Sequence, residues 1–139
     1  MLHVQFRTSS PAGLLFLAAG RRDFLLLELI SGFLQVRLDL GSGERLLRTE
    51  TGIHLNDLGW HSMELTHDRH NVTMTVDRNS HTSLHMPGPD LELMVEDGLF
   101  VGGAAGLSHP YILNISSGFR GCVDEVVFNK HNMLSGLRR

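Results

Sequence analysis

The sequence has little of several features that would point to particular classes of protein. It contains one cysteine in 139 residues, Cys122, which cannot by itself build a disulfide framework or a cysteine-rich zinc site. The formal net charge of −3 provides no basic field to attract nucleic acid, so we expect no nucleic-acid partner. No apolar run approaches the ~20 residues that a membrane-spanning helix needs. A disulfide-rich scaffold, a nucleic-acid-binding protein and a membrane span within this chain are therefore not expected.

The composition is that of one globular domain. Apolar residues make up 42% of the chain and charged residues 19%, which is ordinary usage for a folded protein and unlike that of disordered segments. Single domains most often have about 100 to 150 residues, so we expect residues 1–139 to form one domain. The N-terminal residues lack the basic and long apolar regions of a secretory signal, so any export signal is expected to lie outside this chain.

Short runs with period-two alternation indicate strands, and no long stretch shows helical periodicity. In Phe33 to Leu40 the even positions are apolar, while Gln35 and the other odd polar residues are predicted to face outward. The residues 31–32, Ser-Gly, join this run to Phe24–Ile30, and glycine suits a tight turn because it tolerates positive φ. The two runs are predicted to form an antiparallel hairpin.

A second hairpin is predicted from residues 60–66 and 71–77, with a polar turn at 67–70. Its core face is expected to hold Val72, Met74 and Val76, and Trp60 is expected in the core as well. Further strands are predicted at Gly13–Ala19, Glu44–Thr49, Leu99–Val101 and Cys122–Phe128. Short strands at these spacings favour an all-β fold, an antiparallel β-sandwich.

Five segments, in order along the chain, resemble the laminin G-like domain family. They are Phe6-Arg7-Thr8 with Gly13-Leu14-Leu15, Leu55-Asn56-Asp57 with Trp60-His61, Val76-Asp77, Gly98 to Gly103, and Ser117 to Asn129. The resemblance implies a jelly-roll sandwich that is truncated at both ends, because the family ordinarily has a strand or two before the first segment. It also implies that Cys122 pairs with a later cysteine of the parent protein, so that we expect a free thiol in this chain.

Within the family, the chain looks most like the laminin G domains of membrane-spanning cell-surface proteoglycans. This resemblance implies a non-enzymatic extracellular binding module that recognises a matrix protein or a sulfated glycan. Membrane association would come only through a transmembrane segment of the parent protein outside this chain. The alternative is a calcium-dependent lectin-like or neurexin-like adhesion domain.

Many laminin G-like domains hold calcium at the rim of the sandwich, and the resemblance implies where its ligands would be. They are the carboxylate of Asp23, the backbone carbonyl of Leu40, and Glu96 or Asp97 as a further carboxylate. Calcium suits such a rim because it takes several oxygen ligands in loose geometry. The hairpin at 31–32 is expected to bring Asp23 and Leu40 to the same open end. The alternative interpretation is that these acids are solvated loop residues.

Beside this rim stand Arg21 and Arg22, which suggest contact with a sulfated glycan or with a partner's acidic loop. A solubilising loop is the alternative interpretation of two adjacent arginines. Two sequons, which begin at Asn71 and Asn114, are candidates for N-glycosylation in an exported protein. Both fit an extracellular location.

A hydrolase is the third hypothesis, because sandwich folds also host glycosidases, which need two carboxylates about 5 to 10 Å apart across one cleft. Glu28 and Glu64 are isolated acids on alternating strands and are predicted to face solvent. The histidine pairs His67 with His70 and His81 with His85 lack further ligands at metal-binding spacing and are predicted to be solvated. The chain is therefore not expected to be an enzyme.

Overall fold

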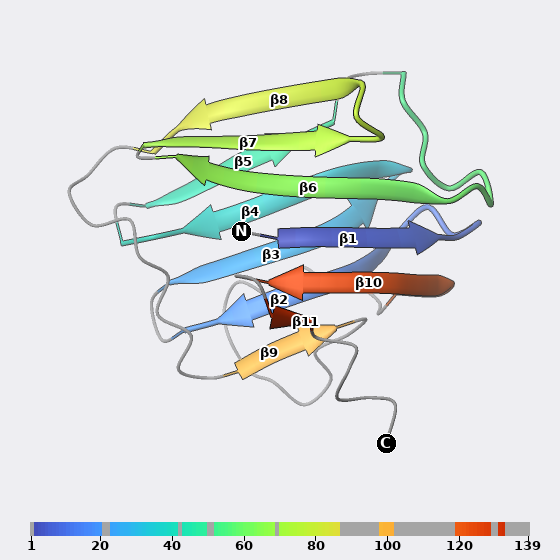
Figure 1. The fold of residues 1–139 in the computed structure, drawn as a ribbon, viewed down its shortest axis with the longest axis horizontal. Helices are drawn as coiled ribbons and strands as arrows, with labels where there is room; N and C mark the ends of the chain where they lie inside the picture. The colour runs from blue at the N-terminus through green and yellow to red at the C-terminus, as the bar shows by residue number, and fades with distance from the viewer. Residues whose placement is uncertain are drawn as a thin grey trace.

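The computed structural model describes residues 2–20, 23–41, 43–49, 52–68, 70–86, 98–101, 119–128 and 131–132. Regular structure in these residues is β-strand throughout (Figure 1). The strands are β1 (Leu2–Arg7), β2 (Gly13–Ala19), β3 (Phe24–Ile30), β4 (Phe33–Asp39), β5 (Glu44–Arg48), β6 (His61–Asp68), β7 (Asn71–Val76), β8 (Ser80–His85), β9 (Gly98–Val101), β10 (Cys122–Phe128) and β11 (His131–Asn132). Within these ranges, no helix is long and apolar enough to cross a membrane.

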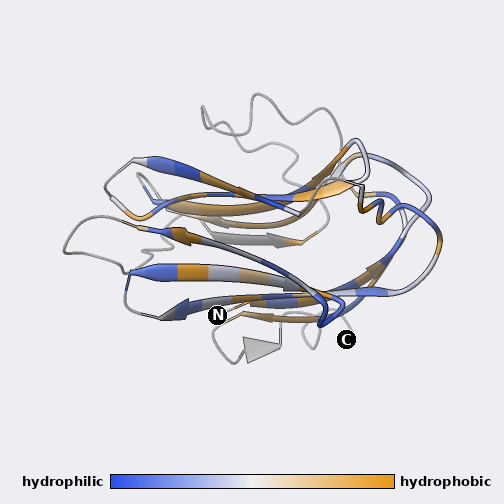
Figure 2. Ribbon diagram, turned by 90° about the horizontal axis from the view of Figure 1, so that it is seen from above, coloured by the Kyte–Doolittle hydropathy of each residue, from blue (hydrophilic) through white to orange (hydrophobic). Residues whose placement is uncertain are grey.

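The strands form two antiparallel sheets. One has six strands in the order β11-β10-β1-β6-β7-β8, and the other has five in the order β5-β4-β3-β2-β9. Figure 2 shows the two sheets edge-on as two layers packed face to face. The predicted antiparallel β-sandwich is therefore confirmed, and strands far apart in the sequence, such as β1 and β10, lie side by side (Figure 1).

The core lies between the two sheets and is built mainly from alternate residues of the strands, except that β2, which has a bulge between Leu14 and Phe16, contributes both Leu15 and Phe16. In β7 the predicted inward residues Val72, Met74 and Val76 are all buried. In β4 the even residues Leu34 and Val36 are likewise fully buried and belong to the same cluster. Period-two alternation thus correctly identified the core face of both strands.

The predicted hairpin at Ser31-Gly32 is confirmed. Ile30 pairs with Phe33, which leaves a two-residue turn, and both turn residues have positive φ, 52° for Ser31 and 85° for Gly32. Two positive φ values are the signature of a type I′ turn, whose twist matches that of the flanking strands. A Cβ on Gly32 would stand 2.8 Å from Asn56 Oδ1, so the Asn56 side chain would have to move, in addition to the strain that the positive φ imposes on a residue with a Cβ.

Two details of the second hairpin differ from the prediction. His67 pairs with Val72 and Asp68 with Asn71, so β6 includes two residues that were predicted to lie in the turn. Trp60, predicted in the core, is 50% exposed and lies under the guanidinium of Arg7 at 5.4 Å. The reason is parity, because Met63 and Leu65 of β6 face the core, and Trp60, an odd number of positions from each, has the outward parity.

The sequence analysis did not predict a strand at Leu2–Arg7, yet β1 occupies an inner position of the six-stranded sheet. It pairs with β10 on one side and with β6 on the other. Leu2, Val4 and Phe6 point into the core and are at most 1% exposed. The alternation of apolar residues at positions 2, 4 and 6 was the signal that could have revealed this strand.

The outer face of the five-stranded sheet is also covered over β2 and most of β3, and this corrects two predictions. Glu28 and Gln35, both predicted to face solvent, are each only 5% exposed. Their neighbours on the same face include Leu26 and Phe24, which are 0% and 4% exposed. A sheet that is buried on both faces has nearly continuous apolar strands, as the run in β3 shows.

Candidate functional site

The rim of the sandwich brings two of the predicted calcium ligands together. Phe24 pairs with Asp39, so Asp23 and Leu40 are the next residues on adjacent strands and stand opposite each other. Asp23 Oδ1 lies 3.9 Å from the position that a Cβ would take on Gly41, which places the carboxylate over the backbone that follows Leu40. The prediction that the hairpin brings Asp23 and Leu40 to the same open end is therefore confirmed.

The start of β9 reaches the same end of the sheet. Gly98 pairs with Ala19, and Ala19 pairs with Phe24, so one row of residues crosses three strands and arrives beside Asp23. Of the other residues predicted for this rim, Glu96, Asp97, Arg21 and Arg22 lie outside the described residues. The part of the chain that the structure describes contains no group of three or more His, Cys, Asp or Glu side chains placed to hold a metal.

The loop after β4 is held in place by Asp39. Its Oδ1 accepts hydrogen bonds from the backbone N–H of Gly41 at 2.8 Å and of Gly43 at 3.3 Å. An aspartate that accepts a bond from the backbone two residues later forms an Asx turn, which fixes the path of the chain. Asp39 therefore has a structural role at the rim and positions the backbone of Leu40.

A ladder of three polar side chains crosses the outer face of the five-stranded sheet. The register pairs Glu28 on β3 with Gln35 on β4, and Gln35 with Arg48 on β5. Gln35 Nε2 donates to Glu28 Oε1 at 2.9 Å, and Arg48 Nε donates to Gln35 Oε1 at 2.6 Å. The bonds satisfy both ends of the Gln35 amide, so the buried pair is not left without partners. Sequence reasoning missed this ladder.

The electrostatics of Glu28 follow from this environment. Burial raises the pKa of its carboxyl above the usual value, and it outweighs the opposing effects of the Gln35 hydrogen bond and of the Arg37 and Arg48 charges. The signal in the sequence was a single acid inside an apolar run. An acid in a strand that is buried on both faces must find partners across the sheet.

A second cluster lies at the start of β6, where His61 stands between two acids. His61 Nδ1 is 2.6 Å from Asp77 Oδ2, and His61 Nε2 is 2.7 Å from Asp57 Oδ1. The two carboxylates also accept backbone N–H groups, from Ser62 at 2.9 Å and from Gly59 at 2.9 Å. His61 thus hydrogen-bonds through both ring nitrogens and packs against Phe6 of the core, with 5.9 Å between the ring centroids.

The charge state of His61 follows from this geometry, because both ring nitrogens can donate only in the imidazolium form. Burial by itself lowers the pKa of His61, but the hydrogen bonds and charges of Asp77 and Asp57 outweigh burial and raise the pKa above 6.5. The hydrogen bond from His61 is the largest cause that lowers the pKa of Asp57, followed by the Gly59 N–H. The cluster therefore fastens the loop before β6 to the turn after β7.

This arrangement predicts a pH-dependent stability. A histidine with a raised pKa stabilises the fold fully below its unfolded value of 6.5, and the contribution is lost as the pH rises through the folded value. We expect the melting temperature of the wild type to fall relative to that of His61→Gln as the pH is raised from 6 to 9. Thermal melts of both proteins across this range provide the measurement. Parallel pH profiles would contradict the assignment.

The remaining predicted residues are placed individually. Asn71 is exposed at the start of β7, so its sequon is sterically open, whereas Asn114 lies outside the described residues. Cys122 is an exposed free thiol opposite Arg7 of β1. Of the histidines predicted to be solvated, His70, His81 and His85 are exposed, and His67 is partly buried; the rings of His70 and His85 lie 5.5 Å apart.

Comparison with known proteins identifies the fold family. Residues 6–131 match the model of the laminin G domain. The chain belongs to the laminin G domain family. Two solved structures support the assignment. The LG4-5 domains of the mouse laminin alpha1 chain match with a TM-score of 0.82 and 28% identity, over 94% of this chain and 36% of that chain. The LG1-3 region of the laminin alpha2 chain matches with a TM-score of 0.81 and 26% identity, over 96% of this chain and 28% of that chain.

Sequence relatives place this laminin G domain beside proteoglycan and neurexin domains. It is 43% identical to chondroitin sulfate proteoglycan 4 of Rattus norvegicus and of Homo sapiens, in each case over 98% of this chain. It is 32% identical to neurexin-2 of Mus musculus over 92% of this chain. The chain spans only 6% of the length of these proteoglycans and 8% of that neurexin. The predicted resemblance to a proteoglycan domain is confirmed.

Proposed function

We propose that this laminin G domain is a non-enzymatic extracellular binding module of a cell-surface proteoglycan that recognises matrix proteins or glycans. The observation that carries the proposal is the 43% identity to chondroitin sulfate proteoglycan 4 over nearly the whole chain. An extracellular location is further supported by the exposed sequon at Asn71. The parent protein's membrane attachment and the pairing of Cys122 with a cysteine outside this chain belong to the same proposal.

The positions of the two candidate acids argue against a hydrolase. Leu27 and Leu29 flank Glu28 and point into the core, so Glu28 lies on the outer face of the five-stranded sheet. Met63 and Leu65 flank Glu64 in the same way, so Glu64 lies on the outer face of the other sheet. Two carboxylates on opposite outer faces cannot flank one glycosidic bond, which needs both within about 10 Å.

The proposal predicts that ligands are bound and released unchanged. Purified collagen and heparan sulfate would be incubated with the chain, and the bound fraction would be eluted and compared with the input by gel electrophoresis and chain-length analysis. We expect saturable binding and no shortening of either ligand. Cleavage of a ligand that increases with the amount of wild-type chain, and that Glu64→Gln abolishes, would contradict the non-enzymatic part of the proposal.

A calcium-dependent lectin-like or neurexin-like adhesion domain is the second candidate function, and the rim favours it. Asp23 offers one carboxylate at the rim, and the backbone at Leu40 stands opposite. These are oxygen donors of the kind that calcium takes. They form a partial set, and Glu96 or Asp97 would complete it. In this proposal the ion would bridge the rim to an acidic group of the partner.

The second candidate predicts a weak calcium site at Asp23. We expect isothermal titration to give a dissociation constant of about 10⁻⁴–10⁻³ M, the range of extracellular modules, and the heat to vanish in Asp23→Ala. Asp124→Ala, an exposed acid on β10, is the matched control and should titrate like the wild type. If the folded wild type gives no heat, the calcium-dependent function is ruled out while the calcium-independent binding module remains.

A further inference from the structure

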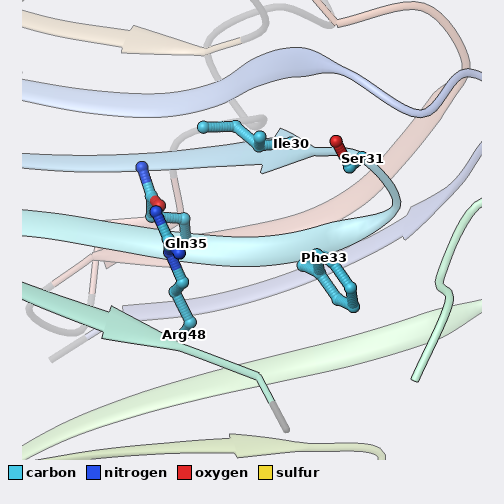
Figure 3. A pocket seen from close by; sticks show the side chains of 5 residues that line it. All are labelled: Ile30, Ser31, Phe33, Gln35 and Arg48. Carbon is cyan, nitrogen blue, oxygen red and sulfur yellow. The ribbon is translucent and has the colours of Figure 1, made fainter. Parts of the chain in front are cut away.

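A small pocket lies at the hairpin end of the five-stranded sheet, at the opposite end of β3 from Asp23. It has a volume of about 140 Å³ and is lined by Ile30, Ser31, Phe33, Gln35 and Arg48 (Figure 3). A cavity of about 150 Å³ holds a molecule the size of benzene, whereas pockets for whole small molecules are about 300 Å³ or larger. The pocket therefore has room for one side chain of a partner.

The guanidinium of Arg48, the cation of this pocket, is held in a fixed orientation before any ligand binds. Arg48 Nε donates to Gln35 Oε1 at 2.6 Å, and Gln35 in turn is held by Glu28 at 2.9 Å. Gln35 is 5% exposed, so the group that orients the guanidinium is itself fixed within the sheet. In the described part of the chain, Arg48 forms no ion pair with an acid. An exposed guanidinium with its Nε engaged retains its terminal nitrogens for a carboxylate.

Two of the five lining residues, Ile30 and Phe33, are apolar and suit the stem of an acidic side chain. Ile30 is 39% exposed, whereas Ile53, the other isoleucine that the structure describes, is partly buried. Phe33 is half-buried, and its ring stacks on that of His54 with 5.5 Å between centroids. Because His54 covers one face of Phe33, the phenyl ring has less free surface on which a sugar ring could stack.

The charges around the pocket favour a single carboxylate over a polyanion. On the same outer face, Arg37 is paired with Glu44 at 2.7 Å, and Asp39 follows on the same strand. A sulfated glycan that bound Arg48 and continued along the adjacent strand β4 would meet Glu44 and Asp39. A protein loop that presents one glutamate can contact Arg48 without reaching them.

We propose that this pocket receives a glutamate side chain from a loop of a partner protein, with its carboxylate on Arg48 and its stem and an adjacent apolar residue against Ile30 and Phe33. The proposal rests on the proposed function, which makes the chain a binding module, and it names one contact of that module. The contact is separate from the calcium rim, because the Ser31-Gly32 turn and Asp23 lie at opposite ends of β3.

The experiment is a titration of the ¹⁵N-labelled 139-residue chain with the capped peptide acetyl-Gly-Leu-Glu-Leu-Gly-amide, followed by NMR. We expect shift changes centred on the backbone amides of Ser31 and Phe33 and on the Arg48 Nε–H. The peptide in which glutamine replaces the glutamate should bind at least about tenfold more weakly, because a charge-assisted pair is lost. Equal binding of the two peptides, or shifts centred elsewhere, would overturn the proposal.

Variants separate this contact from a general effect of charge. Arg48→Gln should lose the response to the glutamate peptide, and Arg48→Lys should retain part of it. Arg45→Gln is the matched control, because Arg45 is exposed on the same strand but has the opposite parity, and it should bind like the wild type. Circular dichroism verifies that each variant is folded. Undiminished binding by folded Arg48→Gln would overturn the proposal.

A heparan sulfate tetrasaccharide distinguishes the other class of ligand. If it shifts the pocket residues while the peptide does not, the pocket is a glycan site and the proposal is overturned. Failure of the proposed function gives a different result, namely no saturable binding of the chain to matrix proteins or glycans. The pocket proposal fails by itself when matrix binding persists unchanged in Arg48→Gln.

Discussion

Replacing Gly121 by alanine is expected to destabilise the fold by about 4 kcal/mol, since overpacking and backbone strain each cost roughly 1–3 kcal/mol. Gly121 precedes β10 and has a φ of 153°, which residues with a Cβ rarely adopt. A Cβ there would overlap the carbonyl oxygen of Arg7 and stand 2.9 Å from Thr8 Cβ. Thr8 cannot retreat freely, because its Oγ1 donates to the carbonyl of Arg120. Urea unfolding measures the loss.

Gly52→Ala is the matched control for Gly121→Ala. Gly52 also has a positive φ, 91°, but a Cβ there would meet no atom within 4 Å. The control therefore carries the backbone strain without the steric overlap, and we expect it to cost about 1 kcal/mol. Equal losses in the two variants would show that the contact of Gly121 with β1 is not what requires glycine.

Phe16→Ala is expected to cost about 3–5 kcal/mol, the usual loss when a buried phenylalanine is truncated. Phe16 lies on β2 and is fully buried, and its ring centroid is 5.3 Å from that of Phe128 on β10. The contact therefore joins the two sheets across the core. Chemical denaturation of the wild type and the variant gives the difference in unfolding free energy.

Two further variants test whether the contact between the sheets is the cause. Leu58→Ala removes an apolar side chain that is 62% exposed, and it should change stability by no more than about 0.5 kcal/mol. The double variant Phe16→Ala/Phe128→Ala should lose less stability than the sum of the losses in the two single variants, because each single variant already removes the same contact. Strict additivity would contradict a direct coupling of the two sheets through these rings.

Much of the fold follows from local patterns in the sequence. The pair Ser31-Gly32 predicted a tight hairpin because a type I′ turn needs positive φ, and alternation predicted the inward residues of β4 and β7. Trp60 was misplaced because its size favours burial, whereas the parity of β6 directs it outward. Strand pairing beyond hairpins, such as that of β1 with β10, depends on residues more than 100 positions apart and is invisible to local patterns.

Local sequence patterns likewise predicted one part of the candidate sites and missed another. The meeting of Asp23 with Leu40 could be predicted, because counting outward from a two-residue turn fixes which residues face each other. The ladder of Glu28, Gln35 and Arg48 could not, because β5 joins through a longer loop whose register local rules do not fix. The burial of Glu28 also required knowledge that its strand is covered on both faces.

The proposed role of this laminin G domain is that of a binding module. Equilibrium binding of the folded chain to immobilised collagen and heparan sulfate, by biolayer interferometry in calcium and in a chelator, tests it most directly. We expect a saturable isotherm with at least one of these ligands, with a dissociation constant of about 10⁻⁶ M (~8 kcal/mol) or tighter, and we expect binding to be lost when the chain is unfolded. Absence of saturable binding by the folded chain to either ligand, with and without calcium, would contradict the account.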